Sequence, residues 1–375
     1  MSSKAEIGDN NMGNQMTRVE RIKAALYSQE VDRVPVDVWQ HFSVEDQDPR
    51  SLAERQVAYT KKFDYDFIKL MPFGLYGVQD YGAKIKIFNQ IEQPPIVEDG
   101  GIHDISDWGR LEVLPAYYGT YGKQIQMVQY VNKLTKGELP YIQTVFSPLT
   151  NARKLAGDRI LTDMKENPVL FKQALQVLTD TTINFIKANI EAGVSGFFFA
   201  TQCATTNFMT EEEYKEFGVP YDLQVINAYK DVTWFNVAHI HGDNAMFDLI
   251  EKYPVQCLSW HDRWGEPSLQ EARTRTNKAF LAGIREIPYF RNGKKIQESL
   301  LVDGSIPEVK LHVFEALDQV DGKGILIGPG CVASQFSTDS NLHAVRSAVA
   351  DYAVGNVGAK KIYPKAGVQN VPVFA

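Results

Sequence analysis

The sequence predicts an α/β fold: a single (β/α)8 barrel with an N-terminal helical extension and an insertion after its second strand. Two observations indicate this fold. Apolar segments of strand length alternate with segments of helical periodicity, which is typical of parallel strands joined by helices. Eight such strands fit within about 340 residues of the 375-residue chain, which suits a closed barrel better than an open parallel sheet.

The predicted strands and helices alternate from residue 17 to residue 353. The strands are expected at 33–39, 66–71, 141–146, 196–200, 233–241, 255–260, 280–285 and 325–328. The helices are expected at 17–26, 51–63, 121–135, 149–167, 168–192, 210–229, 245–252, 268–277, 307–319 and 341–353. Residues 72–113 lack the apolar residues for a core of their own and are interpreted as an insertion with a short hairpin, 83–88 against 95–97.

Local signals justify these boundaries. Thr17 with Glu20, and Thr210 with Glu213, have the spacing of capping boxes, so a helix should begin at each threonine. The strand Gly196–Ala200 is almost entirely apolar, as strands covered on both faces tend to be.

The composition is that of a soluble globular protein, with 44% hydrophobic and 23% charged residues. A net charge of -7 and the absence of a dense Lys/Arg run argue against nucleic-acid binding. No apolar stretch has the length of a membrane span, and the N-terminus lacks the apolar core of a signal peptide. Three scattered cysteines argue against a disulfide framework, so we expect a cytoplasmic protein. The expected domains are a disordered segment 1–16, the barrel 17–357 and a tail 358–375.

The stretch Thr233–Asn244 holds the most informative motif, His239-Ile240-His241 followed by a glycine. Residues i and i+2 of a strand point to the same side, so both imidazoles leave the strand tip on one face. Two nitrogen ligands held in this way can bind a metal. The alternative is a pair of strand-end histidines that hydrogen-bond loop backbone.

Other polar residues fall at the predicted strand tips, which in a barrel face one mouth. Cys331 follows Gly328-Pro329-Gly330 at the last tip, and a thiolate with two imidazoles is a normal zinc set. The alternatives for this tip are a buried apolar thiol or a glycine-rich phosphate cradle. Trp260-His261-Asp262-Arg263 forms a dense cluster at the sixth tip, where Arg263 is suited to clamp a carboxylate and Asp262 to orient an imidazole. An Asp–Arg pair that stabilises the loop is the alternative for this cluster.

These segments resemble the uroporphyrinogen decarboxylase superfamily from Thr17 to about Tyr352. The resemblance rests on four segments: RIKAALYSQEVDRVPVDVW, FFFATQ followed by MTEEEYKEF, AHIHGDN, and GPGCVASQFSTDSNLHAV. It implies a (β/α)8 barrel, often dimeric, with the active site at the barrel mouth.

Three departures argue against tetrapyrrole decarboxylation. The resemblance implies an arginine-rich segment after the first strand, where this chain has Trp39-Gln40-His41-Phe42-Ser43-Val44. The aspartate expected after the second strand is replaced within the segment Phe67-Ile68-Lys69-Leu70-Met71-Pro72, and the late histidine motif by Gly328-Pro329-Gly330-Cys331.

The chain is more similar to the branch of zinc-dependent methyl and alkyl transferases that act on thiols. That branch uses His-x-Cys at the fifth tip and a distant cysteine at the last, whereas this chain has His239-x-His241 and Cys331. The resemblance implies zinc as cofactor, a small-molecule substrate and a corrinoid protein as a partner.

Three hypotheses follow. The first is a zinc enzyme that transfers a methyl or alkyl group to a thiol, with His239, His241 and Cys331 as ligands. In it His261 or Asp262 supports a metal ligand or acts as acid or base, and His41, Gln202 and Arg263 recognise the substrate. Across the hypotheses, the expected catalytic residues are His261, Asp262 and Lys69, and the expected substrate-binding residues are His41, Gln202, Trp260 and Arg263. The second is a metal-free decarboxylase of a small carboxylate, with Arg263 as clamp and Lys69 or His261 as proton donor. The third is a non-catalytic ligand-binding barrel.

Overall fold

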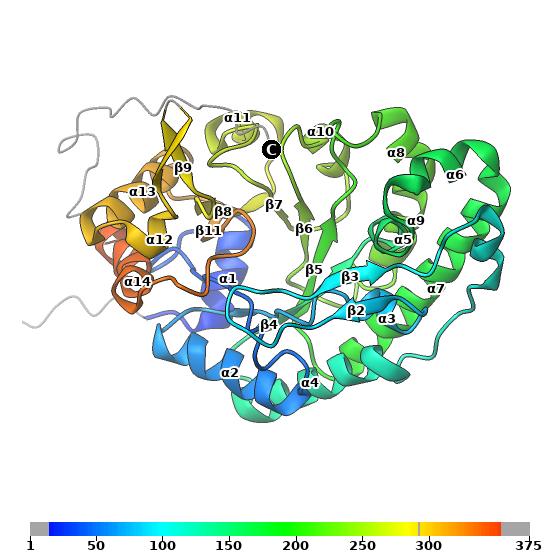
Figure 1. Ribbon diagram of the computed structural model, residues 1–375. Coiled ribbons are helices and arrows are strands. Elements are labelled where there is room, and N and C mark those ends of the chain that lie inside the picture. The colour runs from blue at the N-terminus through cyan, green and yellow to red at the C-terminus, as the bar shows by residue number, and fades with distance from the viewer. Residues whose placement is uncertain (1–14, 292, 354–375) are drawn as a thin grey trace, which may run out of the picture.

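A computed structural model describes residues 15–291 and 293–353 of the chain. Most of the expected lead-in and all of the expected tail lie outside these residues. The described residues form a curled sheet of seven parallel strands surrounded by helices, in the order β1-β4-β5-β6-β7-β8-β11 (Figure 1). The strands are β1 (Ile68–Lys69), β4 (Tyr141–Phe146), β5 (Gly196–Thr201), β6 (Val237–Ile240), β7 (Cys257–Ser259), β8 (Ala279–Ile284) and β11 (Ile325–Pro329).

The helices surround this sheet, and one of them, α1, lies at the end of the barrel. In chain order they are α1 (Arg18–Leu26), α2 (Pro49–Lys62), α3 (Tyr76–Gln79), η1 (Ile105–Arg110), α4 (Gly119–Thr135), α5 (Pro148–Ala156), η2 (Gly157–Arg159), α6 (Ile160–Glu166), α7 (Pro168–Glu191), α8 (Glu211–Phe217), α9 (Val219–Asn227), α10 (Phe247–Ile250), α11 (Leu269–Arg275), α12 (Leu300–Asp303), α13 (Ile306–Asp318) and α14 (Asp339–Ala353). None of the described helices combines the length and the apolar character needed to cross a bilayer.

The first predicted strand, 33–39, closes the barrel without forming a regular strand. It contributes isolated parallel bridges, Val36 to Ile327 and Gln40 to Ala333. On one side, Ile327 N–H donates to the Pro35 carbonyl and Asp37 N–H donates to the Ile327 carbonyl; on the other, Asp66 N–H donates to the Val36 carbonyl. The ladder is interrupted because Pro35 has no N–H and because the Asp37 carboxylate, rather than a backbone carbonyl, accepts from Lys69 N–H at 3.0 Å. The eighth barrel position is therefore filled, but by an irregular segment.

Strand side chains alternate between two separate apolar layers. In β5, Phe198 and Ala200 belong to a cluster inside the barrel, whereas Phe197 and Phe199 pack with the surrounding helices. Both faces are buried, which explains why this strand reads as continuously apolar. The same alternation in β6 puts Val237 inside, and His239 two residues later follows it.

Helix α1 plugs the end of the barrel opposite the mouth. Ile22, Ala25 and Leu26 belong to the same interior cluster as Phe198, and the capping box of Thr17 and Glu20 starts the helix as predicted. Arg21 on this helix is 2% exposed and pairs with Asp66, just before β1, at 2.8 Å.

Several predicted elements have different lengths. The helix predicted over 210–229 is divided into α8 and α9 at Gly218, where a Cβ would lie 2.7 Å from the Tyr214 ring. The helix predicted over 149–167 is divided at Gly157, whose φ of +62° favours glycine. The helix predicted over 245–252 is reduced to the four residues of α10.

Two antiparallel hairpins lie outside the barrel sheet. The first pairs β2 (Lys84–Lys86) with β3 (Ile96–Asp99), as predicted for the insertion. The second pairs β9 (Tyr289–Arg291) with β10 (Lys294–Gln297) and was not predicted. Figure 1 shows the first hairpin running across the barrel toward the segment that follows β11.

Candidate metal centre

Three strand ends deliver the polar side chains of the site. In the parallel register of β6 with β7, His239 is the partner of Ser259. Two residues further along each strand, His241 and His261 therefore lie at neighbouring strand tips. Cys331 lies at the tip of β11, two residues after the strand ends.

His239, His241, His261 and Cys331 form one compact group of potential ligands. One nitrogen or sulfur atom from each lies within 4.8 Å of the corresponding atom of the others. His241 Nδ1 is 3.6 Å from Cys331 Sγ and 3.4 Å from His261 Nε2. Ligand atoms around a tetrahedral zinc ion, with bonds of about 2.0–2.3 Å, are roughly 3.3–3.8 Å apart, so these two separations suit that geometry.

One nitrogen of the group has a lone pair that a metal could use. His239 Nδ1 is 3.2 Å from Ser259 Oγ, while its Nε2 is buried and has no hydrogen-bond partner among the described residues. A buried nitrogen without a partner is costly unless something binds it. Three imidazoles and one thiol are the donor types that zinc prefers. The residues therefore fit a zinc ion.

Electrostatics favour the metal-binding form of the histidines. Burial, followed by the neighbouring His261, lowers the pKa of His241 to about 4 and holds the pKa of His239 well below its usual range. Both rings are thus neutral at pH 7, with a free lone pair. Burial, followed by the negative charge of Glu286, raises the pKa of the Cys331 thiol to about 12, with partial compensation from Lys69. Cys331 alone would hold its proton, and a bound cation would release it.

Glu286 holds His261 in place from behind. Its Oε1 is 2.6 Å from His261 Nδ1 and accepts from Trp264 Nε1 at 3.0 Å. Burial acts to raise the pKa of Glu286, but the hydrogen bonds from His261 and Trp264 outweigh it and lower the pKa. This arrangement leaves His261 Nε2 directed at the group, as in carboxylate–histidine–metal sites.

A cavity of about 300 Å³ opens beside His239, His241 and Cys331. Aromatic and aliphatic side chains form most of its walls, and two lysines also line it. Lys69 is 4% exposed, with its Nζ 4.4 Å from the centre of the Phe198 ring. Lys154 Nζ lies over the Phe146 ring and donates to the Gly74 carbonyl at 3.0 Å. Burial lowers the pKa of each lysine to about 7. No carboxylate is found among the described residues that line this cavity.

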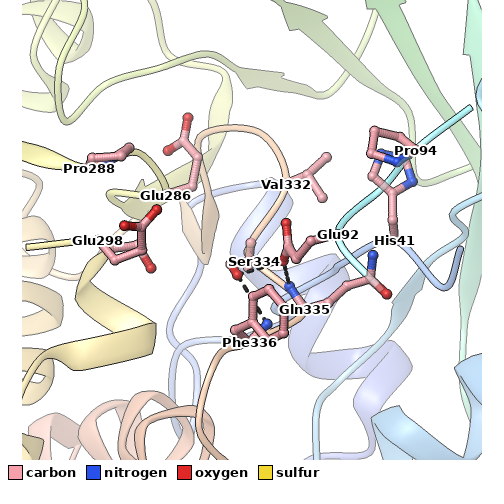
Figure 2. A pocket seen from close by; sticks show the side chains of 12 residues that line it. His41, Glu92, Pro94, Glu286, Pro288, Glu298, Val332, Ser334, Gln335 and Phe336 are labelled. Atoms are coloured by element: carbon pink, nitrogen blue, oxygen red, sulfur yellow. Dashed lines mark hydrogen bonds between the residues drawn. The ribbon is translucent and has the colours of Figure 1, made fainter. Parts of the chain in front are cut away.

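A second cavity of about 500 Å³ adjoins the first. His41, Pro94 and Val332 line both cavities and separate them. Figure 2 shows this second cavity, with Glu286 and Glu298 on one side and His41 and Pro94 on the other.

The structure brings some of the predicted site residues together and directs others away. His41, Lys69 and Gln202 line the smaller cavity with His239, His241 and Cys331. His261, which was expected to be catalytic, is itself a member of the group of potential ligands.

Three predicted residues are engaged elsewhere. Trp260 is fully buried and donates its indole N–H to the Pro267 carbonyl. Asp262 accepts from Gly283 N–H inside the barrel wall, at 3.0 Å. Arg263 pairs with Glu315 and donates from Nε to His312 Nε2 at 3.1 Å. Both partners are in α13, so Arg263 is not placed to clamp a substrate in the cavity.

Sequence reasoning missed Lys154, the contact by which Glu286 supports His261, and the place of His261 in the ligand group. Lys154 lies on a helix in mid-sequence, and nothing in its local pattern marks it. His261 was detectable, because it follows a strand that neighbours the His239-x-His241 strand in a parallel barrel. Its place as a potential ligand depends on the register, which the sequence does not specify.

Comparisons with known proteins show the family and the fold of the chain. Methylcobamide:CoM methyltransferase MtbA of Methanosarcina acetivorans is 21% identical to the chain over 90% of its length and 98% of the relative's. Methylcobamide:CoM methyltransferase MtaA of Methanosarcina barkeri is 23% identical over 90% and 99%. A uroporphyrinogen decarboxylase of Aquifex aeolicus is 26% identical but covers only 51% of this chain and 60% of its own. The full-length likeness is thus to the methyltransferase branch, as the sequence predicted.

Solved structures give the same fold. A methyltransferase from Methanosarcina mazei superposes with a TM-score of 0.74 at 20% identity, covering 90% of this chain and 99% of that one. A B12-independent methionine synthase from Shewanella sp. W3-18-1 reaches 0.54 at 13% identity, over 86% and 94%. At these identities the likeness establishes the barrel. A family model described as uroporphyrinogen decarboxylase (URO-D) matches residues 17–352, and the chain therefore belongs to the URO-D family.

Proposed function

We propose that this protein is a zinc-dependent enzyme that transfers a methyl or related alkyl group to a thiol. The observation that carries the proposal is the group of His239, His241, His261 and Cys331 on the wall of a buried cavity. The relatives that align over 98% and 99% of their own length are named as methylcobamide:CoM methyltransferases, which supports the same reaction class.

The side chains of the group would hold the ion through three nitrogens and one sulfur, or through fewer when a substrate sulfur takes a position. Zinc supplies a Lewis acid that keeps a bound thiol deprotonated, and therefore nucleophilic, at neutral pH. Glu286 fixes the orientation of His261, and Ser259 fixes that of His239. Lys69 Nζ, whose pKa of about 7 allows proton exchange, takes the proton of the entering thiol.

The acceptor thiol carries an anionic group. Lys69 and Lys154 approach the smaller cavity with no carboxylate among its described lining residues to neutralise them. An anion would raise the pKa of Lys154 and offset the cost of burying its charge, while Lys69 stays available to take the thiol proton. Gln202 lies on the same wall and is suited to hydrogen-bond that group.

The methyl donor is a corrinoid carried by a partner protein. The basis for this part is the naming of the relatives as methylcobamide methyltransferases. Methyl transfer would break the donor–carbon bond and form a sulfur–carbon bond. A homodimer in the cytoplasm completes the proposal, and size-exclusion chromatography with light scattering would check the dimer.

The test combines metal analysis with a transfer assay on the purified chain, supplied with zinc. Methylcobalamin serves as a soluble donor, and two thiols serve as acceptors, one anionic and one neutral. We expect one zinc per chain and preference for the anionic thiol. Lys154→Met should raise KM for the anionic thiol about tenfold and leave the neutral thiol unchanged. Lys172→Met, at a surface pair with Glu216, is the control. A metal-free protein under these conditions would exclude the proposal.

One observation favours a second candidate, a metal-free decarboxylase of a small carboxylate. Lys69 is a buried proton donor in a cavity that suits an anion. Retained activity after complete chelation, with carbon dioxide release from a small carboxylate, would favour it over thiol transfer.

A further inference from the structure

The β2–β3 hairpin spans the barrel mouth although it is not part of the barrel sheet. In sequence the hairpin follows β1, and in space it contacts the segment after β11, about 240 positions later in the sequence. Pro94 in this hairpin lines both cavities, and Pro95 lines the smaller one. The hairpin therefore roofs the metal centre and, with His41 and Val332, forms the partition between the cavities.

The tip of the hairpin is held by a small set of polar contacts. Ser334 Oγ donates to Glu92 Oε1 at 2.6 Å, and the backbone N–H of Gln335 donates to the same oxygen. With its amide oriented so that both of its polar atoms find partners, the Gln335 side chain accepts from the Glu92 backbone N–H at 3.1 Å and donates to the His41 carbonyl at 3.2 Å. Among the described residues, the hydrogen bonds joining residues 87–95 to the barrel converge on this cluster. Figure 2 shows Glu92 directed at Ser334 and Gln335, which lie beside it at the edge of the cavity.

Little else anchors the hairpin. None of residues 84–99 is buried, and Ile87, Ile91 and Ile96 are 39%, 54% and 48% exposed. Segments with few buried apolar contacts open at low free-energy cost, and active-site lids are drawn from such segments.

Both feet of the hairpin contain glycines suited to a hinge. Gly82 has φ +96° and Gly101 has φ +85°, a region that favours glycine. A Cβ at Gly101 would lie 3.6 Å from the Gly82 carbonyl oxygen, so the two feet are adjacent. Rotation about this pair would lift the hairpin as one unit.

We propose that residues 84–99 form a hinged strap, latched by Glu92 on Ser334 and Gln335, that controls access to the metal centre. In the latched state the cavity of about 300 Å³ encloses one small reactant beside Cys331. In the lifted state the partition loses Pro94, and the two cavities join to admit a larger second reactant. The strap is an inference about access and rests on the proposed function only for the identity of the two reactants.

Cys331 provides a direct probe of the strap. It is partly buried and lines the cavity, whereas Cys203 and Cys257 are both 0% exposed. The rate of alkylation of Cys331 by iodoacetamide, followed by mass spectrometry on the full-length chain, therefore reports how often the strap opens. Measurement on the protein as purified and again after chelator treatment separates protection by metal from protection by the strap.

The latch variant is Glu92→Ala, and the matched control is Glu98→Ala. Glu98 lies in the same hairpin and pairs only with Lys86 within it, at 3.8 Å. We expect alkylation of Cys331 to accelerate roughly tenfold in Glu92→Ala, from the loss of hydrogen bonds to a charged acceptor, and to remain unchanged in Glu98→Ala. Ser334→Ala should reproduce part of the increase and add little to Glu92→Ala. Hydrogen exchange should quicken in 84–99 and in 334–337 together.

Two outcomes would overturn the strap. Equal alkylation rates in the wild type and Glu92→Ala would show that the latch does not limit access. Equal acceleration in Glu98→Ala would show a general loosening of the hairpin and no latch. Both comparisons use chelator-treated protein, in which no metal protects Cys331, and neither involves methyl transfer, so failure of the strap is distinguishable from failure of the proposed function.

Discussion

Substitution of the histidine and cysteine side chains at the barrel mouth tests the metal proposal directly. His241→Ala and Cys331→Ala each remove one ligand from a group whose atoms lie within 4.8 Å. We expect zinc content and methyl transfer to fall together, while the melting temperature changes little, because a barrel of this size has an ample apolar core without the metal. Metal analysis, calorimetry and a transfer assay measure the three effects.

His103→Ala is the control for these variants, since His103 is 69% exposed and pairs with Asp99 on the surface. It should retain zinc and activity. A large fall in melting temperature for His241→Ala, in step with zinc loss, would instead identify the site as structural.

Glu286 is the residue whose role follows most directly from the structure. Glu286→Gln replaces the carboxylate that bonds His261 Nδ1 with an amide, which weakens the orientation of that ring. Loss of such a supporting carboxylate typically costs about 10- to 100-fold in metal affinity, and we expect a decrease of this size in a competition titration against a chelator.

Glu298→Gln tests whether general charge loss explains the result, because Glu298 lines the same larger cavity but pairs with Lys295 on the surface. Its zinc affinity should match the wild type. If Glu286→Gln also binds zinc normally, His261 does not belong to the ligand set.

At the scale of elements, a buried ion-pair cluster secures the irregular segment that closes the barrel. Asp66 is fully buried, pairs with Arg21 at 2.8 Å and also with Arg33, and accepts from Val36 N–H at 2.9 Å. Removing one partner of a buried pair leaves an uncompensated charge. We therefore expect Asp66→Ala to reduce the free energy of unfolding by about 3–5 kcal/mol, measured by urea denaturation.

Asp64→Ala is the comparison for Asp66→Ala. Asp64 also pairs with two arginines, Arg18 and Arg346, but its side chain is 55% exposed. Exposed pairs contribute about 0–1 kcal/mol, so this variant should unfold almost as the wild type does. Similar losses in both variants would show that Asp66 has no special role in closing the barrel.

The elements also show how far the sequence could predict the fold. Short apolar segments between helical patterns identified the strands of the barrel sheet, because burial on both faces leaves a continuously apolar signature, as in β5. The segment 33–39 was predicted as a regular strand, but its ladder is interrupted by Pro35 and by the side chain of Asp37, and tertiary contacts decide the result. The β9–β10 hairpin was missed because β10 has exposed, charged residues and no apolar alternation.

The site could be predicted in part for a similar reason. His239 and His241 share a strand, so their common direction follows from local geometry. Cys331 could be predicted to lie near them because the strand tips of a barrel share one mouth. Lys154, Glu286 and the engagement of Arg263 with α13 depend on packing between segments far apart in sequence, which local patterns do not determine.

At the scale of the whole molecule, the architecture sets which substrates the family barrel can accept. The cavity beside the candidate metal centre, at about 300 Å³, is at the small end of the roughly 300–1,000 Å³ typical of sites for drug-sized ligands. Its walls are mainly apolar, and its two cations are lysines. The stretch Trp39–Val44, where an arginine-rich segment was expected by resemblance, contains no arginine.

We therefore expect that the protein neither binds nor decarboxylates uroporphyrinogen at an enzymatic rate. A tetrapyrrole with acidic side chains around its whole edge needs several cations spread over a wide mouth, and Lys69 and Lys154 serve one compact cavity instead. The assay follows coproporphyrinogen formation by the purified chain beside a true uroporphyrinogen decarboxylase as the positive control. Glu92→Ala should be included, because a lifted strap would join the two cavities and offer the largest space the mouth provides. Product from that variant alone would mean that the strap, and not the missing arginines, excludes the tetrapyrrole; product from the wild type would mean that the lysines suffice to bind it.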